Sequence, residues 1–173
     1  MQLLIEVLSS FLATIAFGIL FNIHGKNLFF AGVGGGLGWF IYKIGLSFNF
    51  SIVLSMFFGS IAISTYSEIF ARILKTPVTT IVVPALIPLV PGGGMYNTMY
   101  EAIKGDAMST WNQAITTISS AGALALGVLF VSSITRLIYS KKKLYTHGSL
   151  NPKNLLLFKK LKNKDDIEFN NKK

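Results

Sequence analysis

The stretch from Ile81 to Met99, IVVPALIPLVPGGGMYNTM, decides which folds are open to this chain. Four of the five prolines lie between Pro77 and Pro91, and three glycines, Gly92 to Gly94, follow directly. No Lys, Arg, Asp or Glu occurs from Thr76 to Tyr100. The run is therefore long enough to cross a bilayer, for which about 20 apolar residues suffice.

A continuous helix through this stretch is excluded by its prolines. A proline inside a helix has no N–H, and its ring clashes with the carbonyl four residues earlier. The prolines concerned are Pro84, Pro88 and Pro91. The carbonyls expected to lose their helical partners are those of Thr80, Pro84 and Ile87.

The break itself predicts a transport site. Bare backbone at membrane depth is tolerated only where protein buries it or where it lines a wet cavity. If the helix restarts at Met95, its free N–H groups face back toward the break, opposite the freed carbonyls. Such a break offers donors for a carboxylate and acceptors for an ammonium group, and broken membrane helices mark transporter sites.

The composition of the rest of the chain agrees with a membrane protein. Of 173 residues, 51% are hydrophobic and 13% are charged, and the mean hydropathy is +0.56. The net charge of +9 is concentrated in a lysine-rich end, as expected of a cytoplasmic flank, so it does not predict nucleic-acid binding. The absence of cysteine excludes a disulfide framework and a thiolate metal site.

Five segments reach membrane length, so we predict an all-α, polytopic helical bundle in which the fourth segment is broken by Pro and Gly. Residues 1–140 form the expected transmembrane domain, and residues 141–173 form a basic cytoplasmic tail. Because the first segment lacks a basic start and a small-residue cleavage site, we expect it to stay in the mature protein. The expected spans are Leu3–Ile23, Leu28–Leu46, Phe50–Phe70, Thr76–Tyr96 and Ala114–Tyr139.

The orientation follows from Lys and Arg in the short loops. With five spans and the tail inside, the cytoplasmic side collects Lys26, Arg72, Lys75, Arg136 and Lys141 to Lys143, and the outer side keeps Lys43 and Lys104. This bias puts the N-terminus outside. A four-span alternative makes the fourth segment re-entrant. The tail segment that begins at Asn151-Pro152 is expected either to form a basic amphipathic helix on anionic lipid or to stay solvated.

Small residues predict close helix packing in two segments. The second segment contains the pairs Gly32/Gly36 and Gly34/Gly38, which let helix backbones approach closely. The fifth segment repeats the spacing with small residues four apart, at Ser119, Ala123 and Gly127. The glycine spacing fits no nucleotide-binding fingerprint.

A polar stripe runs along the third segment. Glu68 and Arg72 are one helical turn apart in the favourable order for an ion pair, and Ser60 and Ser64 continue the same face. Such a face is expected to point into a bundle or a wet path. The alternative is that the two charges anchor the helix end at the interface. Similar stripes occur in the first and fifth segments: Glu6, Ser10 and Thr14, and Gln113, Thr117 and Ser120.

Together these residues resemble a known family. Glu68-x3-Arg72-x2-Lys75-x-Pro77, followed by Pro84-x3-Pro88-Leu-Val-Pro91-Gly92-Gly93-x2-Tyr96, is similar to the threonine/serine exporter family, over about residues 1–140. Within that family the chain resembles the small subunit of the split, two-protein form, which corresponds to the C-terminal half of the single-chain exporter. The candidate path residues are Ser60, Ser64, Glu68, Arg72, Lys75, Pro84, Pro88, Pro91, Gly92, Gly93, Gly94 and Tyr96.

The resemblance implies a function and a partner. A larger membrane subunit carries the other half, and the pair exports threonine- or serine-like metabolites from a bacterial cytoplasm across the plasma membrane by proton coupling. Export of a small dicarboxylate such as succinate is an alternative, and so is a non-transporting scaffold subunit. The Asp and Glu residues of the expected transmembrane domain do not have the spacing of metal ligands or of a catalytic nucleophile and its base. Neither an enzyme nor a cofactor is therefore expected.

Overall fold

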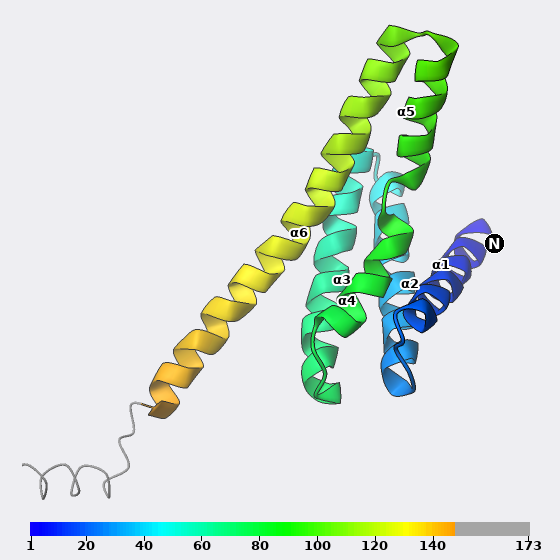
Figure 1. The fold of residues 1–173 in the computed structure, drawn as a ribbon. Helices are drawn as coiled ribbons and strands as arrows, with labels where there is room; N and C mark the ends of the chain where they lie inside the picture. The colour runs from blue at the N-terminus through cyan, green and yellow to red at the C-terminus, as the bar shows by residue number, and fades with distance from the viewer. Residues whose placement is uncertain (148–173) are drawn as a thin grey trace, which may run out of the picture. The chain divides into compact units, whose positions relative to one another are not determined.

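The computed structural model describes the backbone of residues 1–147 and the side chains of residues 1–138, and the predicted tail helix lies outside these residues. The described part is all helical, as predicted, with no strand (Figure 1). Two units are distinguished, Met1–Ile134 and Thr135 onward, and the packing below belongs to the first. The elements are α1 Gln2–Leu20, α2 Lys26–Ser47, α3 Ile52–Leu74, α4 Thr79–Leu86, η1 Ile87–Leu89, α5 Gly92–Lys104 and α6 Ala107–His147.

Helix α2 is the central element, because its glycines let neighbouring helices pack closely against it. It packs against α1, α3, α4 and η1. The pair Gly32/Gly36 faces α1, and the pair Gly34/Gly38 faces α3, with α4 and η1 beyond it. The small-residue pairs of the sequence therefore serve close packing on two different faces of one helix. The side chains that they meet are Val7, Phe11 and Ile15 on one face and Ile63, Tyr66, Ala85 and Leu89 on the other.

The fourth segment is broken where the prolines require it, but the break is tighter than expected. The carbonyl of Pro84 accepts the N–H of Ile87, and the carbonyl of Ile87 accepts the N–H of Val90 at 3.1 Å. Both are short-range bonds of the kind that tightens a helix end. The prediction that the proline break leaves these two carbonyls without partners is therefore wrong.

The helix restarts earlier than the sequence suggested. Helix α5 begins at Gly92, before Met95, and runs on to Lys104, well past the expected end of the segment. None of the three glycines has a positive φ. All three are helical residues, so the need for a left-handed backbone conformation is not the reason that glycine occurs at these positions.

The turn into α6 also comes earlier than expected. Gly105 ends α5 in the left-handed region, at φ 82°. The Asp106 carboxylate accepts the N–H groups of Met108 and Ser109, both at 3.1 Å, and so caps α6. These bonds, led by those from Ser109, hold the pKa of Asp106 below its usual value.

Helix α6 presents a small-residue face that contains two of the three predicted residues. Ala123 and Gly127 are buried as expected, whereas Ser119 is exposed and its neighbour Ser120 is buried. A Cβ atom at Gly127 would meet the Ser60 side chain of α3. The close approach of α6 to α3 therefore depends on Gly127.

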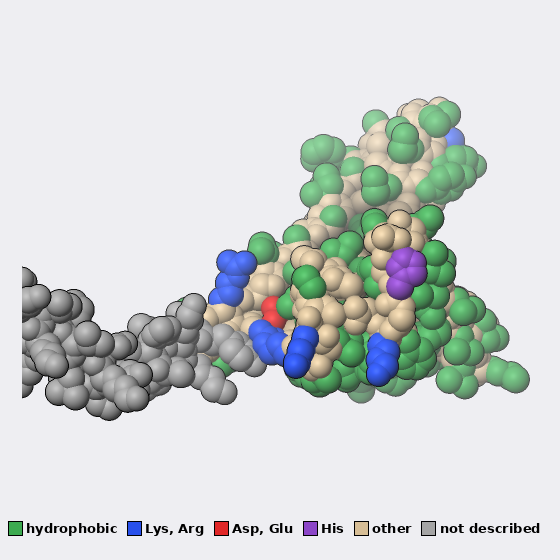
Figure 2. All heavy atoms as spheres, turned by 60° about the horizontal axis from the view of Figure 1, so that its bottom comes forward, with side chains coloured by type: hydrophobic (Ala, Val, Ile, Leu, Met, Phe, Trp, Pro, Cys, Tyr) green, Lys and Arg blue, Asp and Glu red, His purple; other side chains and the backbone are tan. Residues whose placement is uncertain are grey.

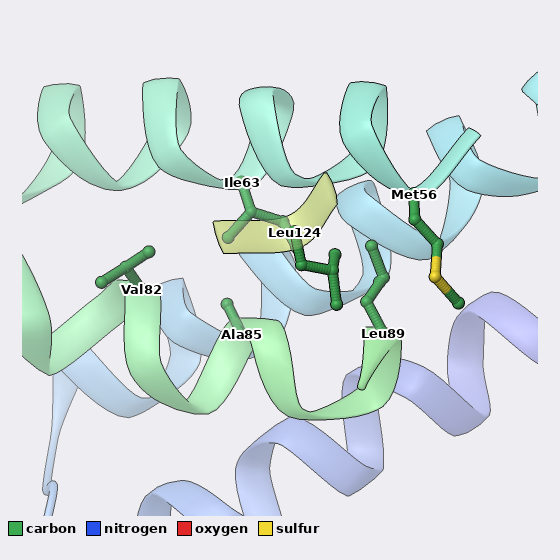
Figure 3. Close-up of a cluster of buried hydrophobic side chains, with 6 residues drawn as sticks. All are labelled: Met56, Ile63, Val82, Ala85, Leu89 and Leu124. Carbon is green, nitrogen blue, oxygen red and sulfur yellow. The ribbon is translucent and has the colours of Figure 1, made fainter. Parts of the chain in front are cut away.

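A compact apolar cluster joins the break to α3 and α6 (Figure 3). Val82 and Ala85 come from α4 and Leu89 from η1, and Met56, Ile63 and Leu124 pack against them. Leu89 is 1% exposed and Ile63 is fully buried. The 3-10 turn after Pro84 is thus held in place by the core of the first unit.

Within the described residues, four helices are long and apolar enough to cross a membrane, and a fifth span results if α4–η1 and α5 count as one. These two halves are bent by 41°. A re-entrant loop has to reverse its direction, whereas these halves continue in the same general direction (Figure 1). This geometry favours five spans over four.

Basic side chains gather at one end of the first unit (Figure 2). This end carries the α1–α2 and α3–α4 connections, with Lys26 at the start of α2 and Arg72 and Lys75 at the end of α3. By the positive-inside rule we expect this end to face the cytoplasm.

Cysteine labelling provides a test of this topology, because the chain has no cysteine of its own. We expect a membrane-impermeant maleimide to label Gln2→Cys and Lys104→Cys on intact cells, and Tyr145→Cys only after permeabilisation. Labelling of Tyr145→Cys from outside contradicts the orientation. Labelling of Gln2→Cys and Tyr145→Cys from one side contradicts five spans.

Candidate functional site

A cavity of about 450 Å³ opens at the break in the fourth segment. The break forms one wall, from Pro88 to Gly94 except Gly92, and Asn97 of α5 with residues 113–120 of α6 forms another. Met56 and Leu89 line the cavity and also belong to the apolar cluster, so the cavity borders the core. Its lining is Trp39, Tyr42, Ile52, Met56, Pro88, Leu89, Val90, Pro91, Gly93, Gly94, Asn97, Gln113, Thr116, Thr117 and Ser120.

The polar groups of this cavity are all uncharged. The hydroxyl of Thr117 donates to the Gln113 carbonyl at 2.7 Å, and that of Ser120 donates to the Thr116 carbonyl at 2.7 Å. Their oxygen lone pairs and the amide of Gln113 remain for a ligand. Asn97 adds a second amide from α5. The lining can therefore donate and accept hydrogen bonds without presenting a charged side chain.

The start of α5 adds backbone donors to the same wall. Gly93 and Gly94 lie in its first turn, where their N–H groups have no acceptor within the helix, whereas the N–H of Gly92 donates to the Val90 carbonyl at 2.7 Å. A Cβ atom at Gly94 would lie 2.6 Å from the Thr117 hydroxyl, so glycine here allows α5 to approach α6 closely. A Cβ atom at Gly93 would meet nothing within 4 Å.

The residues predicted for the break separate into two groups. Pro88, Pro91, Gly93 and Gly94 line the cavity. Gly92 and Tyr96 are exposed and lie outside its lining, and the Tyr96 ring stacks on Tyr100 with centroids 6.1 Å apart. Pro84 lies next to a smaller cavity of about 230 Å³, which is lined by Phe21, Ile23, Thr79, Thr80, Val83 and Pro84.

The charged pair of α3 is distant from this cavity. Arg72 Nη2 lies 2.7 Å from Glu68 Oε2, and Arg72 also donates to the Glu68 carbonyl. From Met56 on the cavity wall to Glu68 the helix rises about 18 Å, at about 1.5 Å per residue. Lys75 is exposed and ends α3 in the left-handed region. The structure therefore does not bring the Glu68 turn together with the break.

The serines between these two places are buried. Ser60 is fully buried and its hydroxyl donates to the Phe57 carbonyl at 2.8 Å. Ser64 is 2% exposed, and its hydroxyl has no hydrogen-bond partner among the described residues. Both serines belong to the interior of the first unit and not to the wall of the large cavity.

Sequence reasoning missed a second polar cluster, which joins α1 to α2. Glu6 Oε2 lies 2.8 Å from Lys43 Nζ and accepts the indole N–H of Trp39 at 3.1 Å. The signal was present, because Trp39 and Lys43 are one turn apart in a membrane segment and Glu6 lies in another. Pairing between helices remote in sequence cannot be deduced from spacing alone. The aromatic wall residues Trp39 and Tyr42 were missed for the same reason.

Comparison with known proteins gives one result. The family model described as "Threonine/Serine exporter, ThrE" matches residues 6–134, which include every residue that lines the cavity. No curated protein and no solved structure matches the chain. Among the described residues, no group of acids and histidines is arranged to hold a metal ion.

Proposed function

The chain belongs to the threonine/serine exporter family, and from that membership we propose that it is one subunit of a secondary transporter that exports small carboxylate-bearing metabolites of the threonine and serine type. The proposed location is the bacterial plasma membrane, with the tail in the cytoplasm. The observation that carries the proposal is the cavity at the Pro–Gly break. A subunit that only supports another protein has no need of a polar cavity at membrane depth.

The lining suits a hydroxy amino acid. The first turn of α5 directs N–H groups and the positive end of a helix dipole at the wall, which favours a carboxylate. The amide oxygens of Asn97 and Gln113 are acceptors for an ammonium group. The hydroxyls of Thr116, Thr117 and Ser120 can exchange hydrogen bonds with a hydroxyl of the substrate.

The lining also argues against a dicarboxylate. A dianion taken from water into this cavity meets no Lys or Arg side chain among the lining residues. A charge buried without a partner is expensive, whereas a zwitterion brings both signs and no net charge. We therefore rank serine and threonine above succinate.

A partner subunit is part of this proposal. Helix α5 has no buried residue, and Gly93 and Asn97 are exposed although they line the cavity. A wall so exposed needs a cover, and a larger membrane subunit of the same family supplies one. The residues Glu68, Arg72, Lys75, Ser60, Ser64 and Pro84 lie toward the other membrane face, where we propose that they serve the cytoplasmic part of the path.

Efflux measurements test the function and the dependence on a partner together. Cells loaded with labelled serine, threonine or succinate are compared with and without this chain and with and without the larger subunit. We expect serine and threonine efflux only when both chains are present, because one chain leaves the cavity wall uncovered. Succinate efflux is expected to stay at the background level.

Three results contradict parts of the proposal. Efflux by the purified chain alone in liposomes removes the need for a partner. Succinate efflux equal to that of serine removes the zwitterion argument. Full efflux by the larger subunit without this chain leaves only a scaffold role.

A further inference from the structure

The cluster of Glu6, Trp39 and Lys43 adjoins the large cavity through one side chain. Trp39 lines the cavity of about 450 Å³ at the break. Together with Pro88 it also lines a second cavity of about 310 Å³. The remaining wall of this second cavity comes from α1, at Ile5, Glu6, Ser9, Ser10 and Ala13. Trp39 and Pro88 thus form the partition between two cavities.

The position of the Trp39 ring is held from the α1 side. Its N–H donates to Glu6 Oε2 at 3.1 Å, and the same oxygen lies 2.8 Å from the Lys43 ammonium. On its other side the ring lies against Tyr42, with centroids 5.4 Å apart. Bonds to a charged acceptor are about twice as strong as neutral ones. The charge on Glu6 therefore decides how firmly the partition is held.

We infer that Glu6 is a positioning residue, which holds Trp39 as a gate between the cavity at the break and the second cavity beside α1. The inference rests on the proposed function, because a gate matters only to a transported substrate. Protonation of the carboxylate removes the charge that strengthens its bonds to the indole and the ammonium. The indole is then held less firmly, and its rotation can join the two cavities.

The groups that act on Glu6 are few. Helix α2 supplies Lys43 in direct contact and Tyr42, which interacts electrostatically with the Glu6 charge. From η1, Pro88 is the residue that shares the second cavity with Glu6, and it carries no charge. Among the described residues no other charged group contacts Glu6. A response of Trp39 to pH therefore reports on this cluster.

Tryptophan fluorescence tests the gate without a transport assay. The chain has two tryptophans, and Trp111→Phe leaves Trp39 as the single emitter. In the purified chain we expect Trp39 emission and its quenching by acrylamide to titrate in the acid range. Glu6→Gln is expected to abolish this titration completely. The matched control Glu101→Gln, which alters the Glu101–Lys104 pair of α5, is expected to leave it unchanged.

A second variant, Lys43→Gln, tests the inference independently in case Glu6→Gln does not fold. Lys43→Gln keeps the bond from Trp39 to Glu6 and removes only the ammonium, so the titration is expected to persist with a shifted midpoint. A Trp39 signal that is flat with pH, or a titration unaltered in Glu6→Gln or in Lys43→Gln, overturns the inference. Because fluorescence needs no substrate, a flat signal beside normal efflux refutes the gate alone. A titrating signal without efflux refutes the transport function on which the gate depends.

Discussion

Replacing Gly93 with valine is expected to reduce serine and threonine efflux by at least about tenfold, equivalent to about 1.4 kcal/mol, with membrane levels unchanged. Gly93 lines the cavity at the break, and a Cβ atom there meets nothing within 4 Å. Because Gly93 lines the cavity, we expect the valine side chain to take up space that a substrate needs while displacing no atom of this chain. The loss comes from occlusion of the cavity.

A graded series separates occlusion from a conformational requirement. Gly93 has no positive φ, so alanine fits its backbone as well as glycine does. We expect efflux to fall progressively through Gly93→Ala, Gly93→Val and Gly93→Leu as the side chain grows. Gly122→Val is the control, since a Cβ at Gly122 also meets nothing within 4 Å and Gly122 lies outside the cavity lining. A complete loss already at Gly93→Ala contradicts occlusion.

A large effect on folding is expected at Gly35 of α2. A Cβ atom there would overlap the side chain of Thr14, which is fully buried in α1 and whose hydroxyl donates to the Ser10 carbonyl at 2.8 Å. Overpacking of a core typically costs about 1–3 kcal/mol. We expect Gly35→Ala to lower the melting temperature of the purified chain and Gly35→Leu to remove it from the membrane.

The control for this substitution lies in α6. Gly122→Ala makes the same chemical change inside a helix, with open space at the new Cβ atom. It is expected to stabilise the protein by up to about 1 kcal/mol, the difference in helix propensity between glycine and alanine. Thr14→Ala combined with Gly35→Ala is expected to recover part of the loss, because it removes the nearest clashing atom. Equal melting temperatures for Gly35→Ala and Gly122→Ala would refute the packing argument.

The helices and the break could be predicted because their causes are local. Apolar length, prolines and glycines act within a few residues, and they give the spans, the interruption and the glycine faces of α2. The sequence could not indicate which of Ser119 and Ser120 in α6 is buried, because both are equally small and only the position of α3 decides it. The partners of the Pro84 and Ile87 carbonyls depend on a 3-10 turn that Leu89 anchors in the core.

The candidate site was predicted only in part, for a related reason. The sequence indicated Pro88, Pro91, Gly93 and Gly94, and it noted the stripe of Gln113, Thr117 and Ser120, all of which line one cavity. It did not indicate that α2 closes this cavity with Trp39 and Tyr42. The ion pair that it predicted within α3, Glu68 with Arg72, is present, but it did not indicate the pair of Glu6 and Lys43 between α1 and α2. Contacts between elements need the tertiary arrangement.

The cap of α6 limits how α5 can move. The lowered pKa of Asp106 keeps its carboxylate ionised at physiological pH, beside Lys104 at the end of α5. Drawing one such charge to the centre of the hydrocarbon layer costs about 2.5–3.5 kcal/mol even on lenient scales. The tip of the α5–α6 hairpin is thus held in water, while the other end of α5 meets the break at Pro88 and Pro91. A slide of α5 along the membrane normal that carries Asp106 into the hydrocarbon layer is therefore costly, whereas a rotation of α5 about the break keeps the tip in water.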